Sequence, residues 1–380
     1  MNVSGFIDRR FESELSLYRN QQSNKSLRKI FRSGKIPKIL FFDDKPISGM
    51  DWQVLFRDII QNQCPLPCEM LSDFNYVKSV DAIIFHLRAI PSVKKMYELV
   101  GKRDPTQPWI MFSHEHHFKG SMPKYLPYKT WNGVFNRTLH WRWDADIPYS
   151  HGFVVHKKYL KHIPKYKYKP YETKFNFSNK LLAATFISNC HDNSGRLKYI
   201  KELQKFIPIH VYGKCGKFKC GSSLIPRSNY TSAENPCYKY IAEKYLFFLA
   251  FENGICPDYV SERPYDIMYH TIIPIVYGGA KYADYFPPNS VIDASHMKPF
   301  MLATLILKVA SDENRFMKYF EWKKHYQTSV IGGSRNICLL CSRLYDPNFY
   351  ETKIIEDFYD WYVNQSNCID GNKNPPWLDI

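Results

Sequence analysis

The sequence has 380 residues, of which 44% are hydrophobic and 16% aromatic, and its mean hydropathy is −0.41. This composition and length suit two folded domains and exclude a disordered chain, while the high aromatic content suits carbohydrate or nucleotide contact, or a large aromatic core. The 52 Lys and Arg residues exceed the 36 Asp and Glu residues by 16, which favours nucleic acid, phosphorylated small molecules or acidic membranes as partners.

Strand and helix patterns alternate along the first half of the chain. Short apolar runs, typical of strands buried on both faces, occupy 35–44, 81–87 and 108–115. Apolar residues at helical spacing occupy 50–62 and 92–102.

A basic run with interleaved aromatic residues follows at 156–174. Such a pattern could indicate a protein that binds single-stranded nucleic acid. Because runs of charge are usually solvated, we favour a solvated basic connector between two domains.

The alternation restarts after this run. The predicted strands are 180–188, 208–213, 245–253, 271–279 and 290–295, and the predicted helices are 194–207 (capped by Asn193 or Ser194), 260–270 and 299–312. Each half is therefore predicted to be a doubly wound α/β domain with a mainly parallel sheet. Two such domains facing each other would form a cleft, with ligands beyond the carboxyl ends of the strands.

The predicted organisation has four parts. An N-terminal extension covers 1–34, a first α/β domain covers 35–165, a second covers 166–345, and a C-terminal segment covers 346–380.

The sequence has ten cysteines, and those at 64/68, 215/220 and 338/341 look like loop positions, which favours disulfides in a luminal protein. The close pairs 64/68 and 338/341 lie at opposite ends of the chain, which disfavours a shared zinc ion. No apolar run approaches the ~18–20 residues of a membrane helix and no signal peptide follows Met1. If the protein is luminal, we expect its targeting segment either to be missing from this sequence or never to have existed. Six N-x-S/T sequons favour a secretory route: Asn2, Asn24, Asn136, Asn176, Asn229 and Asn364.

Several common catalytic motifs are absent from the sequence. No G-x-G-x-x-G follows the first strand of either half, and there is no P-loop, H-E-x-x-H or G-x-S-x-G. Redox cofactors, P-loop nucleotide hydrolysis and serine hydrolysis therefore lose support.

Polar residues gather where two strands of the second half end. In the loop 188–196, free backbone N–H groups and Arg196 could seat a phosphate. In the stretch 251–266, Glu262 could accept two ribose hydroxyls, Arg263 could neutralise a diphosphate, and Tyr259 could pack on a base or sugar. The alternatives are an ordinary loop and a capped helix, each with solvated charges.

A carboxylate follows a predicted strand of the first half at Glu115, among three histidines. A carboxylate at the mouth of a dry cleft can serve as a general base. A metal site is the alternative, but the flanking residues His114, His116 and His117 would point in alternating directions in an extended segment.

At these residues the sequence resembles the α-1,3-fucosyltransferase family, which are inverting enzymes that use GDP-fucose. The resemblance runs from about residue 36 to about residue 345 and keeps the order of the family's motifs. Its segments are FENGICPDYVSERPYDIMYHTIIPIVYGGAKYADYFPPNSVID (251–293), FNRTLHWRWDADIPYSHG (135–152), SNCHDNSGRLKYIKEL (188–203), FHLR (85–88) and CLLC (338–341).

The resemblance implies roles for individual residues. Glu115 would be the general base that deprotonates a hydroxyl of N-acetylglucosamine, which then attacks fucose C1 from the face opposite GDP. Arg196 and Arg263 would hold the diphosphate, and Glu262 the ribose. The other donor-binding residues implied are Ser188, Asn189, Asn253 and Tyr259.

The resemblance also implies two facing Rossmann-like domains of the GT-B type, with the acceptor side first and the GDP-fucose side second. It implies that no cofactor is required, with a divalent metal at most stimulatory. N-glycans or lactosamine-type glycans would be the acceptors, with no nucleic acid partner. Members usually sit in the Golgi with an N-terminal membrane anchor, so the Golgi lumen or cisterna membrane is the expected location.

The sequence departs from the family pattern at four places. Arg263 replaces a lysine, and His116 and His117 stand where many members have Ser-Pro. The usual Tyr-Arg-Arg-Asp-Ser-Asp reads WRWDAD at 141–146. In addition, residues 267–272 lack the common Ala-Gly. A catalytically inactive relative that binds sugar nucleotide or glycan therefore stays open as an alternative.

Overall fold

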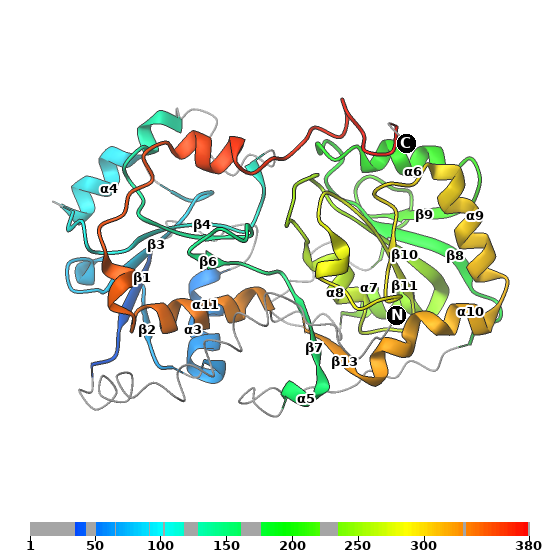
Figure 1. The fold of residues 1–380 in the computed structure, drawn as a ribbon, viewed down its shortest axis with the longest axis horizontal. Helices are drawn as coiled ribbons and strands as arrows, with labels where there is room; N and C mark the ends of the chain where they lie inside the picture. Colours follow the sequence, from blue (N-terminus) through cyan, green and yellow to red (C-terminus); the bar gives the residue numbers. More distant parts are fainter. Residues whose placement is uncertain are drawn as a thin grey trace.

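The computed structural model describes residues 35–42, 51–117 apart from 65, 91 and 102, 128–160, 176–220, 235–329 and 332–378. Within these residues the chain forms two α/β halves that lie side by side, each built on one parallel sheet (Figure 1). We call the half with the six-stranded sheet the first half and the half with the five-stranded sheet the second half. The predicted fold class of two α/β units with parallel sheets is confirmed.

The sheet of the first half has the strand order β2-β1-β3-β4-β5-β6, and every pair is parallel. Its central strands are buried on both faces, which explains why they appear in the sequence as continuous apolar runs. The strands are β1 (Lys38–Phe42), β2 (Glu69–Leu71), β3 (Ala82–His86), β4 (Trp109–Ser113), β5 (Arg137–His140) and β6 (Ile147–Pro148).

Helices cover both faces of this sheet. On one face, α3 (Trp52–Gln63) begins where the Asp51 side chain accepts a hydrogen bond from the Val54 N–H, and it buries one apolar stripe. On the other face, α4 (Val93–Val100) is capped by Ser92 in the same way and buries Met96 and Val100. Both helices were predicted from their periodicity.

The sheet of the second half has the order β12-β11-β10-β8-β9 and is also parallel. Helices again lie on both faces, with α6 and α9 in one core cluster and α7 and α8 in the other. The elements are β8 (Leu181–Phe186), α6 (Arg196–Leu203), β9 (Ile209–Tyr212), α7 (Pro236–Lys244), β10 (Tyr245–Phe251), α8 (Glu262–Ile267), β11 (Ile273–Tyr277), β12 (Ile292–Asp293), α9 (Pro299–Ala310) and α10 (Glu313–Met317).

The start of α6 differs from the prediction. The cap is Gly195 rather than Asn193 or Ser194, and its φ of 71° lies in the left-handed region that glycine adopts at little cost. The Ser194 hydroxyl still accepts a hydrogen bond from the Arg196 N–H at 3.2 Å. A Cβ at this position would also lie 2.4 Å from the Gly371 carbonyl oxygen, which explains why a glycine stands here.

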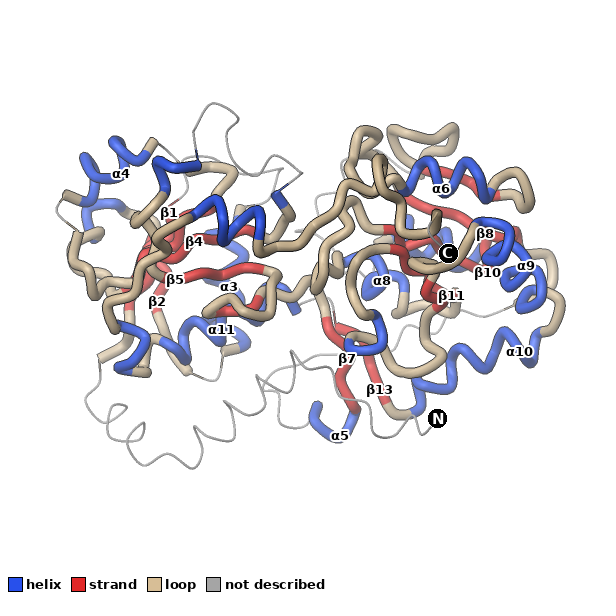
Figure 2. The backbone as a smooth tube through the Cα atoms, turned by 45° about the horizontal axis from the view of Figure 1, so that its top comes forward, coloured by secondary structure: helices blue, strands red, loops and turns tan. Residues whose placement is uncertain are grey.

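The chain returns to the first half after completing the second sheet. Strand β13 (Tyr326–Ser329) pairs antiparallel with β7 (Phe153–His156), and α11 (Gly332–Arg343) then packs against α3 in the first core. Figures 1 and 2 show this return beneath the two sheets. This helix lies inside the range 166–345 that was predicted for the second domain, yet it packs in the core of the first half. The domain limits themselves stay a prediction.

All ten cysteines are paired in disulfides, as expected for a chain in an oxidising compartment. Two of the positions expected to be loops are helical: Cys338 and Cys341 lie three residues apart on one face of α11 and reach the segment after α3. The pairs are Cys64–Cys338, Cys68–Cys341, Cys190–Cys215, Cys220–Cys237 and Cys256–Cys368.

Two predicted segments lie outside the described residues: the N-terminal extension 1–34 and residues 161–174 of the basic connector. The described start of the basic run continues β7 into the short helix α5 (Lys157–Leu160). Across the part of the chain that the structure describes, no helix is both long and apolar enough to cross a membrane.

Candidate functional site

Glu115 lies just beyond the carboxyl end of β4, where the sequence predicted it. Its backbone is fixed by Ser113, whose hydroxyl donates to the Glu115 carbonyl oxygen at 2.8 Å. The residue is 7% exposed, so a charged carboxylate here depends on its polar neighbours.

Two of these neighbours come from the second half. The Tyr259 hydroxyl lies 3.0 Å and the Asn253 amide nitrogen 3.4 Å from Oε2 of Glu115, and each can donate to it. Burial, with the negative charge of Glu115 next in importance, holds the pKa of Tyr259 well above its ordinary value, so the phenol is a neutral donor. Since Glu115 follows β4 and Asn253 follows β10, the carboxyl ends of the two sheets meet at this point.

The histidines around Glu115 are packed against rings and glycine. Nε2 of His114 lies 3.9 Å from Oε1 of Glu115. The ring of His116 packs on Tyr259 with ring centroids 5.2 Å apart, and it lies so close to Gly254 that a Cβ there would come within 2.6 Å. Burial lowers the pKa of His117 to about 4, so this histidine is neutral at physiological pH. Among the described residues, no group of three or more His, Cys, Asp or Glu side chains is arranged to hold a metal ion.

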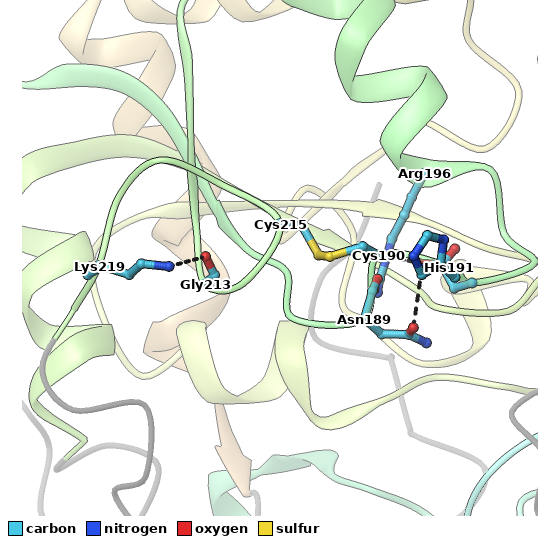
Figure 3. The surroundings of a disulfide bond; sticks show 8 residues. Asn189, Cys190, His191, Arg196, Gly213, Cys215 and Lys219 are labelled. Atoms are coloured by element: carbon cyan, nitrogen blue, oxygen red, sulfur yellow. Dashed lines mark hydrogen bonds and ion pairs between the residues drawn. A yellow bond between two sulfur atoms is a disulfide. The ribbon is translucent and has the colours of Figure 1, made fainter.

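Arg196 opens helix α6 from the loop after β8, and its guanidinium is fully buried. Its nitrogen atoms donate to Asp192 Oδ2 at 2.7 Å, to the Phe251 carbonyl at 3.1 Å and to the Asn189 carbonyl at 3.2 Å. Figure 3 shows the side chain directed into this loop, which the disulfide Cys190–Cys215 ties to the loop after β9. Arg196 therefore stabilises the loop 188–196, the predicted phosphate site, through hydrogen bonds to Asp192 and Asn189 of that loop.

Arg263 meets Arg196 at a shared acceptor. Its Nη1 donates to the Phe251 carbonyl at 3.0 Å and lies 4.0 Å from Oε2 of Glu252. Burial would lower the pKa of Arg263, but the carboxylates of Glu262 and Glu252 outweigh burial and raise it. With a side chain that is 18% exposed, Arg263 is the more accessible of the two cations.

The remaining predicted residues lie around the same edge. Glu262 begins α8, and its Oε2 is 3.7 Å from Nδ1 of His151. Ser188 is exposed and Asn189 is half-buried in the loop after β8. The structure thus brings the loop residues 188–196, the segment 253–263 and Glu115 to one edge.

Three further residues belong to this arrangement and were not predicted. Asp192 pairs with Arg196, and its place four residues earlier could have suggested the pair. His151 bridges the halves, since its Nε2 also lies 2.9 Å from the His114 carbonyl oxygen. Glu252 is buried beside Arg263, and burial raises its pKa to about 7.

This geometry can perform one kind of chemistry well. The Glu115 carboxylate of the first half contacts the hydrogen-bond donors Tyr259 and Asn253 of the second half, and two cations, Arg196 and Arg263, lie at the carboxyl end of β10 in that same half. Such a site can take a proton from a hydroxyl on one side and stabilise an anionic leaving group on the other.

Two family models match the chain. The model described as "Fucosyltransferase, N-terminal" matches residues 35–152, and the model described as "Glycosyltransferase family 10 (fucosyltransferase) C-term" matches residues 177–361.

Similar proteins carry matching names. Alpha-(1,3)-fucosyltransferase C of Drosophila melanogaster is 29% identical over 341 residues, which are 83% of this chain and 74% of that protein. Glycoprotein 3-alpha-L-fucosyltransferase A of the same organism is 28% identical, over 88% of this chain and 62% of that protein. Human 4-galactosyl-N-acetylglucosaminide 3-alpha-L-fucosyltransferase FUT6 is 26% identical, over 77% of this chain and 75% of that protein.

Solved structures show the same fold. A crystal structure of an alpha1,3-fucosyltransferase with GDP has a TM-score of 0.52 at 15% identity, covering 86% of this chain and 94% of that one. A structure of an alpha1,3-fucosyltransferase with GDP-fucose has a TM-score of 0.50 at 13% identity, covering 83% and 90%. The fold is thus the GT-B arrangement of two Rossmann-like units.

Proposed function

Since the chain belongs to glycosyltransferase family 10, the α-1,3-fucosyltransferases, we propose that it transfers L-fucose from GDP-β-L-fucose to a hydroxyl of N-acetylglucosamine on a glycan. The product is an α-1,3-fucoside, formed with inversion at fucose C1. The single observation that carries this proposal is the contact of Glu115, from the first half, with Asn253 and Tyr259 from the second half.

Glu115 acts as the general base in this proposal. Its Oε2 accepts hydrogen bonds from Tyr259 and Asn253, and the carboxylate takes the proton of the acceptor hydroxyl. The two donors also fix the carboxylate in one orientation, which a base needs.

The transfer is a single displacement at fucose C1. The acceptor oxygen gives its proton to Glu115 and forms a bond to fucose C1, while the bond from C1 to the phosphate oxygen breaks. GDP leaves with that electron pair. Because the acceptor attacks opposite the leaving group, a β-linked donor gives an α-linked product.

The leaving diphosphate is stabilised by the two arginines. Arg263 faces it as the more accessible cation, and Arg196 adds its charge from beneath while holding the 188–196 loop. Glu262 binds the ribose at the start of α8. The rest of the donor pocket is formed by Ser188, Asn189, Asn253 and Tyr259.

A luminal location in the Golgi follows as part of the proposal. Five disulfides support an oxidising compartment. Two of the sequon asparagines, Asn176 and Asn364, are exposed, so a glycan on either would not disturb the core. The glycan acceptors meet the enzyme in the same compartment.

The test is release of GDP from GDP-fucose by the purified chain, with N-glycan core and lactosamine acceptors compared in parallel. Acceptor-dependent release with an α-1,3-linked product supports the transferase and identifies its acceptor class. Tight GDP binding without release on any acceptor would instead support the inactive relative that binds the sugar nucleotide.

A further inference from the structure

The C-terminal residues 358–377, which we call the strap, run from the first half to the second along the edge that carries the candidate site. Figure 1 shows this segment in red, passing over the gap between the halves and ending beside α6. We infer that the strap is a positioning element of the donor site, which fixes the loops 189–196 and 253–259 relative to Glu115. The inference rests on the proposed function for its assignment of these loops to the donor.

The strap is anchored in the first half beneath Glu115. Phe358 and Tyr362 are buried in the core of that half. The Tyr362 hydroxyl lies 3.5 Å from the Ser113 hydroxyl, the group that holds the Glu115 carbonyl oxygen. In addition, the Arg142 guanidinium donates to the Trp361 carbonyl oxygen and stacks over its ring at 4.7 Å from the ring centroid.

The strap next joins the loop between Asn253 and Tyr259. Cys368 forms a disulfide with Cys256 in the middle of that loop. One residue further on, the Ile369 N–H donates to the Ile255 carbonyl oxygen at 2.9 Å. A covalent bond and a backbone hydrogen bond therefore hold the loop that presents two of the neighbours of Glu115.

It then reaches the loop that leads to Arg196. The Gly371 N–H donates to the Asn193 carbonyl oxygen at 2.7 Å. The side-chain amide nitrogen of Asn372 donates to the Asp192 carbonyl oxygen at 2.6 Å. Beyond these contacts, Trp377 packs on Tyr199 of α6 with ring centroids 5.5 Å apart.

The two backbones fit together only because each carries a glycine at the crossing. A Cβ on Gly371 would lie 2.3 Å from the Ser194 carbonyl oxygen, and a Cβ on Gly195 would lie 2.4 Å from the Gly371 carbonyl oxygen. Both neighbours are backbone atoms, so a side chain at either position would push the loop and the strap apart. The position of the loop 189–196 therefore depends directly on the position of the strap.

Two variants test the inference without removing a group from the reaction. The first is Gly371→Ala, and the second is the double variant Cys256→Ser with Cys368→Ser. The control for the glycine is Gly101→Ala, which has a φ of 76° at the end of α4 but meets only the flexible end of Lys78 at 3.7 Å. The control for the disulfide is Cys64→Ser with Cys338→Ser, a bridge in the first core.

The first readout is hydrogen exchange of the chain without ligand. Faster exchange of peptides covering 189–196 and 253–259 in the strap variants, and not in the controls, supports the inference. Exchange at the wild-type rate in both loops overturns it. The disulfide variant keeps the test decisive if Gly371→Ala does not fold.

The second readout separates positioning from general stability. We expect the GDP dissociation constant and the donor KM to rise roughly tenfold in the strap variants, with the acceptor KM unchanged. An equal rise in the controls overturns the inference, because it would show a general loss of stability. If the wild-type chain binds no GDP, the proposed function fails, while the exchange measurement still decides whether the strap holds the loops.

Discussion

The guanidinium groups of Arg196 and Arg263 both donate to one atom, the main-chain oxygen of Phe251, at 3.1 and 3.0 Å. Two cations so close together repel each other, and burial followed by this repulsion lowers the pKa of Arg196 to about 10. Asp192 and Glu252 offset part of the repulsion from within the protein. A bound dianion would offset more of this repulsion, so the two arginines together favour the binding of a diphosphate.

Replacement of Arg263 tests this attraction directly. We expect Arg263→Gln to raise the GDP dissociation constant about 10- to 100-fold, because a hydrogen bond to a charged group is worth about 1.5–3 kcal/mol. Arg263→Lys keeps the charge and should recover part of the affinity. Calorimetric titration with GDP measures both, and equal affinity in the Gln variant would remove Arg263 from the diphosphate site.

Replacement of Arg196 should affect both binding and stability. Arg196→Ala removes the cationic partner of the buried Asp192 carboxylate, and breaking a buried ion pair costs about 3–5 kcal/mol of unfolding free energy. It should also weaken GDP-fucose binding. In the double variant Arg196→Ala with Asp192→Ala, part of the stability should return in urea unfolding while GDP affinity stays low; recovery of both would confine Arg196 to a structural role.

Replacement of Glu115 separates chemistry from binding. Glu115→Gln keeps the shape and can still accept a hydrogen bond from Tyr259, but it cannot take a proton. We expect GDP binding to persist and transfer to fall about 10²–10⁴-fold, the usual contribution of a general base. Single-turnover transfer beside GDP titration provides the measurement, and a wild-type rate in this variant would exclude Glu115 as the base.

The raised pKa of Glu252 makes a prediction about pH. Because burial raises its pKa from 4.5 to about 7, the folded protein binds a proton that the unfolded chain releases between these pH values. This group therefore stabilises the fold below about pH 4.5 and loses that contribution as pH rises through 7. Comparing urea unfolding of the wild type with Glu252→Gln from pH 4.5 to 8 should show the wild type losing about 3 kcal/mol relative to the variant; parallel curves would show that Glu252 titrates normally.

The sequons should differ in use when the chain is made in a eukaryotic secretory pathway. Asn136 is 1% exposed, its Oδ1 accepts from the Trp109 N–H at 2.7 Å and its Nδ2 donates to the Gln107 carbonyl oxygen at 3.0 Å, so folded protein has no room for a glycan there. We expect glycans at Asn364 or Asn176 and none at Asn136. Peptide mass spectrometry of the folded, secreted protein checks this, and a glycan on Asn136 would contradict it.

Apolar periodicity was enough to predict most of the fold. The continuous apolar runs of β1, β3 and β10 and the helical spacing of apolar residues in α3 and α9 can be recognised within a short stretch of sequence. The short strands β2 and β6 were not predicted, because three residues or fewer are too short to show a period, whereas β12 lies inside the predicted strand 290–295. The return of α11 to the first half was also missed, since nothing in its own sequence says which sheet it covers.

The site could be predicted residue by residue but not as an arrangement. Polar residues after β4, β8 and β10 indicated where chemistry would gather, since carboxyl ends of parallel strands share an edge. That Tyr259 contacts Glu115 depends on how the halves face each other, and the hydrogen bond from Arg196 to Phe251 depends on how the segments after β8 and β10 meet within the second half. Those contacts join residues 144 and 55 positions apart, beyond the range of local patterns.

The bridges between α3 and α11 bear on the order of events during synthesis. Cys64 and Cys68 precede their partners by 274 and 273 residues. At about 5–20 residues per second, a ribosome needs roughly 15–55 s to cover that distance. The face of the first sheet that α3 and α11 cover together therefore lacks α11, and Cys64 and Cys68 lack their native partners, until nearly the whole chain has been made.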